Sequence, residues 1–231
     1  MVRPPPLLPT GLQRRLLPAD ASRRSTLPLA SEQQPEPGSP GEAERAALQR
    51  ALVRVLSKPG GYHAAGPGEI ARAAGLSPET FYAHYRNAEE CYLATYDAAI
   101  NELRVAMAEG AEEARSAHGA DAWRRQLDGA VGAMLTFLAK WPELARALFT
   151  EVHNAGPAAM LRREAMLARF VSDIDHARAT LDNPAPALAS GVLVRGLDQV
   201  ISARIARGMT QQLPMMLDDL SHYWREPGTD D

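Results

Sequence analysis

The sequence is poor in the features that mark disulfide-rich, metal-binding or membrane proteins. Its single cysteine, Cys91, excludes a disulfide framework and any multi-cysteine metal or iron–sulfur site. Apolar runs such as 131–139 and 188–194 fall far short of the roughly 20 residues of a membrane-spanning helix. Gly-rich phosphate loops, Gly-x-Ser-x-Gly and His-Glu-x-x-His are missing, and no set of Glu-x-x-His pairs could hold a di-iron centre. We therefore expect no metal, no cofactor, no membrane association and no enzymatic activity.

An excess of charge of one sign is missing too. The 25 basic and 28 acidic residues give a net charge of -3, so the composition carries no global signature of nucleic-acid binding. Any such function has to come from a local motif. Apolar residues make up 45% of the chain, which is enough for a sizeable core and excludes a wholly disordered protein.

The first 41 residues differ from the rest, because they hold nine of the 18 prolines. This density of helix breakers predicts a disordered tail over 1–41, and it disfavours the long amphipathic helix of a transit peptide. The remaining chain has few β-branched residues and has prolines at regular breaks, which predicts an all-α fold. We expect about nine helices, at 42–57, 67–74, 78–84, 88–115, 120–140, 143–154, 157–181, 185–208 and 213–225.

The second and third of these helices are short and are joined by a tight turn. Gly75 can end the first of them in the left-handed conformation, Ser77 can cap the next, and Pro78 suits its first position. Two short helices joined by a glycine-containing turn are typical of a helix-turn-helix, in which the second helix enters the major groove of DNA.

At these residues the sequence resembles the tetracycline-repressor (TetR) family of bacterial regulators. The matching residues are Gly61, Tyr62, Ala64, Glu69, Ile70, Ala71, Ala74, Gly75, Leu76, Ser77, Pro78, Thr80, Phe81, Tyr82, His84, Tyr85 and Glu89. The resemblance implies a helix-turn-helix domain at 42–88 and a helical ligand-binding and dimerisation domain at 89–231. It implies double-stranded operator DNA as a partner, with contacts from Ser77, Pro78, Glu79, Thr80, Tyr82, His84, Tyr85 and Arg86.

At two places the sequence departs from the family pattern, and both departures remove an expected contact with the DNA phosphate backbone. Ala88 stands where the family usually has lysine, and Gly66 and Gly68 stand where a basic or hydroxyl pair is common. Residues 42–96 carry six basic and six acidic side chains, so we expect few phosphate contacts and a shallow salt dependence of DNA binding. The arginines of the 1–41 tail are candidates to compensate from the minor groove.

The C-terminal part carries apolar stripes that are compatible with plain core or with a cavity for a small lipophilic ligand. In the family the pocket lies among the central helices, so we expect ligand contacts from Met134, Phe137, Leu138, Trp141, Phe149, Met166, Phe170 and Arg195. Stripes near the end of the chain predict a homodimer interface, with packing inside the protomer as the alternative. That interface comprises Leu188, Val192, Ile201, Leu213, Met216, Leu217, Leu220 and Trp224.

These features together predict a cytoplasmic, nucleoid-associated transcriptional repressor. It would act as a homodimer on a palindromic operator and would be released by a small lipophilic ligand. The alternative is a TetR-like helical interaction protein that has lost specific DNA binding. Cys91 is expected to be a buried apolar thiol rather than a redox sensor.

Overall fold

The computed structural model describes residues 40–114, 122–178 and 187–222, and within these ranges the chain is all-helical without strands, as predicted. The predicted 1–41 tail lies outside the described residues except for its last two. Three short 3-10 segments are η1 (Gly61–Ala64), η3 (Glu151–His153) and η4 (Thr210–Met216). The described α-helices are α2 (Pro40–Leu56), α3 (Pro67–Ala74), α4 (Pro78–His84), α5 (Ala88–Glu113), α6 (Ala122–Lys140), α7 (Pro142–Phe149), α8 (Pro157–Arg178), α9 (Ala187–Ala206) and α10 (Leu217–Ser221).

Prolines open these helices where the sequence predicts. Pro67, Pro78 and Pro142 occupy the first turns of α3, α4 and α7, and Pro157 begins α8. The first turn has no intrahelical acceptor for its N–H groups, so the missing donor of proline is harmless there.

Two predicted helices are wrong in part. The one over 143–154 ends at Phe149, and the chain continues as the 3-10 turn η3. The one over 213–225 begins as the 3-10 segment η4, which contains Pro214, and becomes α-helical only at Leu217. A proline inside a helix removes one backbone hydrogen bond and crowds the preceding turn, which explains the irregular start.

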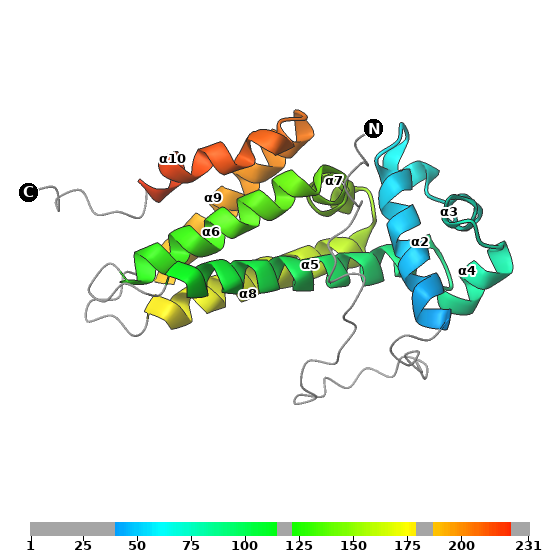
Figure 1. Cartoon of the computed structure of the whole chain (residues 1–231), viewed down its shortest axis with the longest axis horizontal. Helices are drawn as coiled ribbons and strands as arrows, with labels where there is room; N and C mark the ends of the chain where they lie inside the picture. Colours follow the sequence, from blue (N-terminus) through cyan, green and yellow to red (C-terminus); the bar gives the residue numbers. More distant parts are fainter. Residues whose placement is uncertain (1–39, 115–121, 179–186, 223–231) are drawn as a thin grey trace, which may run out of the picture.

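The helices form two units that share α5 (Figure 1). Helices α2, α3 and α4 gather at one end of the molecule, and the elongated bundle of α5 to α10 occupies the rest. Helix α5 starts beside α2, packs along α6 on one side and contacts α8 on another. The C-terminal segment η4–α10 lies on α6. One continuous helix therefore joins both units.

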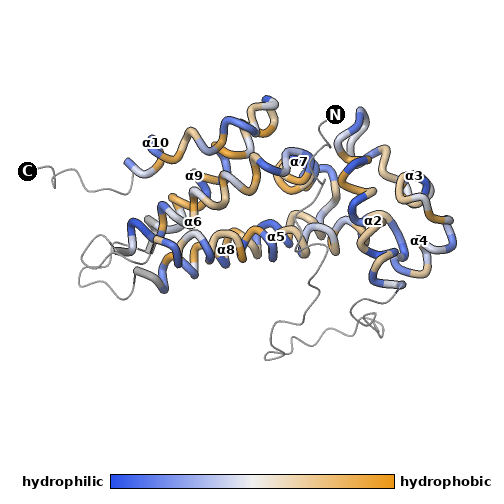
Figure 2. Tube along the Cα trace, viewed as in Figure 1, coloured by the Kyte–Doolittle hydropathy of each residue, from blue (hydrophilic) through white to orange (hydrophobic). Residues whose placement is uncertain are grey.

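Apolar side chains form the buried core of both units. Figure 2 shows hydrophobic positions along the helices of both units. In the three-helix unit Leu48, Leu52, Ile70 and Phe81 are fully buried. Cys91 is also fully buried, as expected, and this burial raises the pKa of its thiol to about 12. The thiol is therefore protonated and unreactive at neutral pH. Within the described ranges, no helix has both the length and the hydropathy that crossing a membrane requires.

Helices α5 and α6 touch through their backbones at Gly110 and Gly129. A Cβ atom placed on either glycine would overlap the carbonyl oxygen of the other. The two glycines thus let the axes approach more closely than any side chain would allow.

We predict that Gly129→Ala lowers the free energy of unfolding by about 1–3 kcal/mol, because the added methyl group must push the two helices apart. Chemical denaturation followed by circular dichroism measures the change. The control is Gly68→Ala in α3, where a Cβ atom would meet nothing within 4 Å. Equal effects of the two substitutions would contradict the close-approach explanation.

Candidate nucleic-acid interface and ligand cavity

The turn between α3 and α4 has the features that the sequence predicts. Gly75 adopts a left-handed conformation with φ of 73°, and the N–H of Leu76 donates to the carbonyl of Ala71. The Ser77 hydroxyl accepts a hydrogen bond from the N–H of Thr80 at 3.2 Å, which caps α4. The two short helices are therefore separate elements joined by a sharp turn.

Helix α4 presents an open face at the outer edge of the molecule (Figure 1). Ser77, Pro78 and Glu79 are exposed at its start, and Thr80 is half-buried. Tyr82 is 59% exposed, although its ring meets Phe81 edge-on. In the described structure α4 packs mainly on α2 and α3, so neighbouring elements leave this face accessible. The open face of α4, as we use the term below, comprises Ser77, Pro78, Glu79, Thr80 and Tyr82.

The structure does not bring the remaining predicted DNA contacts to this face. Tyr85 is buried; its hydroxyl accepts from the Gln49 amide at 3.0 Å, and burial raises its pKa. The imidazole of His84 lies 2.8 Å from the Glu44 carboxylate and is 11% exposed. Arg86 is exposed, but both its backbone N–H and its guanidinium donate to the Glu90 carboxylate.

Most of the positive charge around α3 and α4 has a partner within the protein. Glu69 pairs with both Lys58 and Arg72, and Arg54 donates to the carbonyl of Ala73. The Glu79 carboxylate places a negative charge at the start of α4, and a hydrogen bond from Ser77 lowers its pKa. A phosphate backbone would meet few unpaired cations here.

A buried carboxylate joins the two units. Glu151, in η3 of the bundle, is 2% exposed and accepts a hydrogen bond from the backbone N–H of Tyr62 at 3.0 Å. Arg146 and Asn154 donate to the same carboxylate at 2.9 and 3.3 Å. Gly61 has a φ of +49°, and a Cβ atom there would collide with the Glu151 carboxylate. We call the contact of Glu151 with Gly61 and Tyr62 the domain latch.

Aromatic packing reinforces the domain latch. The ring of Tyr62 meets that of Tyr92 edge-on, with 5.6 Å between centroids. The Tyr92 hydroxyl, on α5, donates to the carbonyl of Ala147 in α7 at 2.8 Å. Helix α7 is thereby held against the part of the molecule that carries the helix-turn-helix.

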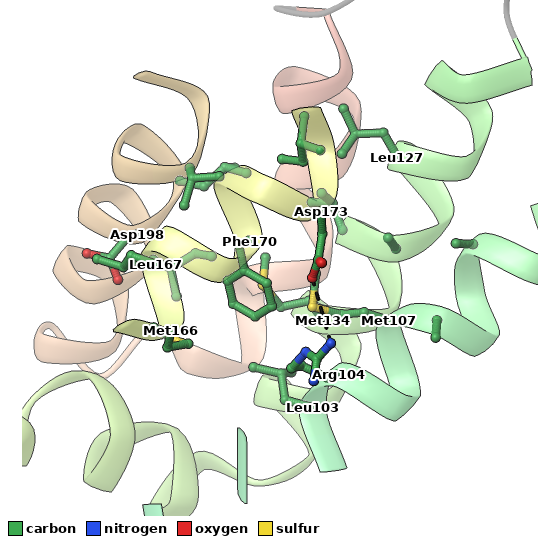
Figure 3. Close-up of a pocket in the computed structure, with 18 of the residues that line it drawn as sticks. Leu103, Arg104, Met107, Leu127, Met134, Met166, Leu167, Phe170, Asp173 and Asp198 are labelled. Atoms are coloured by element: carbon green, nitrogen blue, oxygen red, sulfur yellow. Dashed lines mark ion pairs between the residues drawn. The ribbon is translucent and has the colours of Figure 1, made fainter. Parts of the chain in front are cut away.

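A cavity of about 530 Å³ lies among the bundle helices, a size typical of ligand pockets (Figure 3). Four of the predicted ligand contacts line it: Met134, Phe149, Met166 and Phe170. The other lining residues come mostly from α5, α6, α8 and α9. They are Leu103, Arg104, Met107, Ala108, Ala111, Trp123, Gln126, Leu127, Ala130, Val131, Leu167, Asp173, Ile174, Val194, Leu197, Asp198 and Ile201.

The other four predicted ligand contacts lie elsewhere. Phe137, Leu138 and Trp141 pack in or against the core without lining the cavity, and Arg195 is exposed and pairs with Glu164 at 2.9 Å. Sequence reasoning missed the contribution of α5. The four-residue spacing of Leu103 and Met107 could have indicated this contribution, because the two residues continue an apolar stripe of α5 beyond the helix-turn-helix.

The predicted dimer residues are split between the surface and the interior. Val192 on α9 is 64% exposed, whereas Ile201 is buried and lines the cavity. The apolar stripe of 213–220 faces inward: Leu213 and Met216 are buried, Leu217 packs over Gly132 of α6, and Leu220 packs against the core. The Leu188 side chain and Trp224 lie outside the described residues.

Charged side chains line the cavity at two places. Arg104 of α5 faces Asp173 of α8, with 3.8 Å between guanidinium and carboxylate. Asp198 of α9 pairs with Arg163 of α8, and burial raises the pKa of the Asp198 carboxyl. Across the described residues, no three His, Cys, Asp or Glu side chains gather as a metal site would require.

An outward helix-turn-helix beside a bundle with an apolar cavity defines a class of DNA-binding regulators, and the comparisons with known proteins agree. Residues 50–95 match the family described as "Bacterial regulatory proteins, tetR family". No curated protein matches the sequence. A TetR family transcription regulator from Marinobacter aquaeolei VT8 is 25% identical with a TM-score of 0.55, and the match covers 78% of this chain and 95% of that one.

Two other solved structures show the same fold. The fatty acid degradation regulator FadR from Bacillus halodurans is 18% identical, with a TM-score of 0.66 over 81% of this chain and 95% of that chain. FadR from Bacillus subtilis, solved in complex with stearoyl-CoA, is 14% identical, with a TM-score of 0.62 over 76% and 95%. Residues 50–95 thus match the helix-turn-helix part of the TetR family, and the fold of the described residues is that of these solved regulators.

We predict that Glu151→Gln lowers the free energy of unfolding by about 1–3 kcal/mol, because the amide removes a charge-assisted acceptor from several donors. Thermal and denaturant unfolding would measure this change. The matched control is Glu164→Gln, which breaks an exposed ion pair and should leave unfolding unchanged. An unchanged midpoint for Glu151→Gln would show that the domain latch contributes little.

Proposed function

We propose that the protein is a homodimeric repressor that binds a palindromic operator and is released when a lipophilic ligand fills the bundle cavity. The observation that carries this proposal is a largely apolar cavity of about 530 Å³ in a chain whose helix α4 is open to solvent. The Bacillus subtilis FadR structure contains stearoyl-CoA, which supports a ligand with a long aliphatic chain. Such a regulator works in the cytoplasm, on the nucleoid.

In this proposal the open face of α4 contacts the major groove. Its start offers the hydroxyls of Ser77 and Thr80, and Tyr82 adds an amphipathic ring that can reach a phosphate or a base edge. Two such helices in a symmetric dimer would lie about 34–36 Å apart to meet successive major grooves.

The domain latch links the cavity to the DNA-binding unit. Phe149 lines the cavity at the end of α7, and Glu151 follows two residues later. A ligand that displaces Phe149 would move η3 and, through Glu151, the backbone at Gly61 and Tyr62. To release DNA, the ligand must bind more tightly to the conformation in which the two α4 helices no longer match the grooves.

We propose that the dimer forms on the surface of α8 and α9. This surface exposes Leu161, Val192 and Val200. Gly191 and Gly196, on α9, have open space where a Cβ atom would lie, so a second copy can approach closely. The C-terminal stripe of 213–220 packs on α6 instead, which favours an interface formed by α8 and α9.

Gel shift and fluorescence anisotropy, with DNA from upstream of the gene that encodes this protein, test the function. We expect a specific complex that dissociates when a long-chain aliphatic ligand is added. Tyr82→Ala should weaken this complex roughly tenfold without changing the melting temperature, because the side chain is largely exposed. The control is Met215→Ala, which removes an exposed side chain of η4.

One observation favours a second candidate function, a helical interaction protein without specific DNA binding. The basic residues near α4 are largely paired with carboxylates of the same unit, so phosphate attraction is weak. Absence of any specific complex at low salt would support this candidate. A specific complex with a shallow salt dependence would support the repressor.

We predict that Val192→Glu converts the protein to monomers, because a charge in the centre of an apolar interface is costly to bury. Analytical ultracentrifugation gives the oligomeric state, and DNA affinity should fall with it. Val105→Glu, at an exposed valine of α5, is the control and should leave the dimer intact. A dimer that persists in Val192→Glu would place the interface elsewhere.

A further inference from the structure

The charged residues of the cavity wall differ in how far solvent reaches them. Asp198 is paired with Arg163, whose side chain is 6% exposed and also donates to the hydroxyl of Ser202 at 3.5 Å. This pair is enclosed by α8 and α9 and its two charges balance, although one oxygen of Asp198 and one guanidinium nitrogen of Arg163 make no hydrogen bond. Arg104 and Asp173 are therefore the solvent-accessible charged groups among the residues that line the cavity.

Arg104 and Asp173 form an ion pair without a hydrogen bond between them. The Arg104 guanidinium has five N–H donors, and the Asp173 carboxylate lies 3.8 Å away, beyond hydrogen-bond distance. The Arg104 side chain is 31% exposed and that of Asp173 is 55% exposed, so water reaches the carboxylate more easily than the guanidinium. Figure 3 shows the two side chains pointing toward one another from α5 and α8.

The wall around Arg104 is apolar. Leu103 and Met107 flank it on α5, Met134 contributes from α6, and Phe170 contributes from α8. Among the described residues that line the cavity, Arg104 is the one cation. A single arginine beside a mostly apolar cavity complements a molecule with an aliphatic chain and one planar anionic group, because the guanidinium fork matches a carboxylate.

We propose that Arg104 binds the carboxylate of a free fatty acid whose chain lies in the cavity, and that Asp173 is the group that this carboxylate replaces. The inference rests on the proposed function, since it names the ligand class of the same cavity. An exposed, long ion pair contributes little stability, so exchanging Asp173 for the ligand costs little. Asp173 competes for Arg104 and so weakens the binding of anions that cannot accept two hydrogen bonds from the guanidinium.

The test is isothermal titration calorimetry on the full-length chain with dodecanoate and with dodecanol, which share a chain length. We expect wild-type protein to bind dodecanoate roughly tenfold more tightly than dodecanol, the size expected for one charge-assisted pair. Arg104→Gln should abolish this preference and leave dodecanol affinity unchanged, which also shows that the variant folds. Asp173→Asn should strengthen dodecanoate binding several-fold by removing the competing carboxylate.

The matched control is Arg195→Gln, because Arg195 also pairs with a carboxylate of α8 but does not line the cavity. It should bind both probes as the wild type does. Equal wild-type affinity for dodecanoate and dodecanol would overturn the role of Arg104 and leave the proposed function standing. If the protein binds dodecanoyl-CoA tightly but not dodecanoate, and Arg104→Gln does not weaken the binding of dodecanoyl-CoA, the role of Arg104 is wrong. The ligand is then a thioester.

Failure of both probes to bind would overturn the inference and the ligand part of the proposed function together. DNA binding, measured by gel shift on the same preparations, is independent of this result. If the protein does not bind DNA but still prefers dodecanoate, the proposed repressor function is wrong and the proposed carboxylate site stands. The two failures are thus distinguishable.

Discussion

The buried carboxylate of Glu151 connects the bundle to the backbone of the helix-turn-helix unit at Gly61 and Tyr62. A charged group with so little access to water is stable only where several donors satisfy it, and here they come from Tyr62, Arg146 and Asn154. One of these donors belongs to the helix-turn-helix unit and the others belong to the bundle. The two units therefore share one electrostatic site, in which η3 contacts the helix-turn-helix unit directly.

Helix α5 supplies the second link between the units. Its first turns carry Cys91 and Tyr92 in the core near the helix-turn-helix, and its later turns carry Leu103 and Met107 in the cavity wall. The backbone contact at Gly110 and Gly129 fixes how closely α6 approaches it. The shape of the cavity therefore depends on a helix that also packs against the helix-turn-helix unit, so the proposed ligand and DNA would both act on α5.

Charged side chains are paired differently around helix α4 and in the bundle cavity. Around α4 the cations are largely paired with carboxylates, which leaves hydroxyls and one tyrosine for recognition and limits attraction to phosphate. In the cavity, one arginine faces a carboxylate too distant for a hydrogen bond. Specific contacts rather than net charge therefore govern both proposed binding events, as expected for a chain of net charge -3.

Local backbone preferences are enough to place the helix starts and the turn. Pro67, Pro78 and Pro142 open helices, and Gly75 with Ser77 makes the turn, because each acts within one turn of its own backbone. The packing partner of each apolar stripe, in contrast, follows from the three-dimensional arrangement of the helices. Leu213 and Met216 were buried as their pattern indicates, but against α6 of the same chain, and Arg104 rather than Arg195 reached the cavity. A periodic stripe specifies that a face is buried, whereas its partner depends on residues far away in the chain.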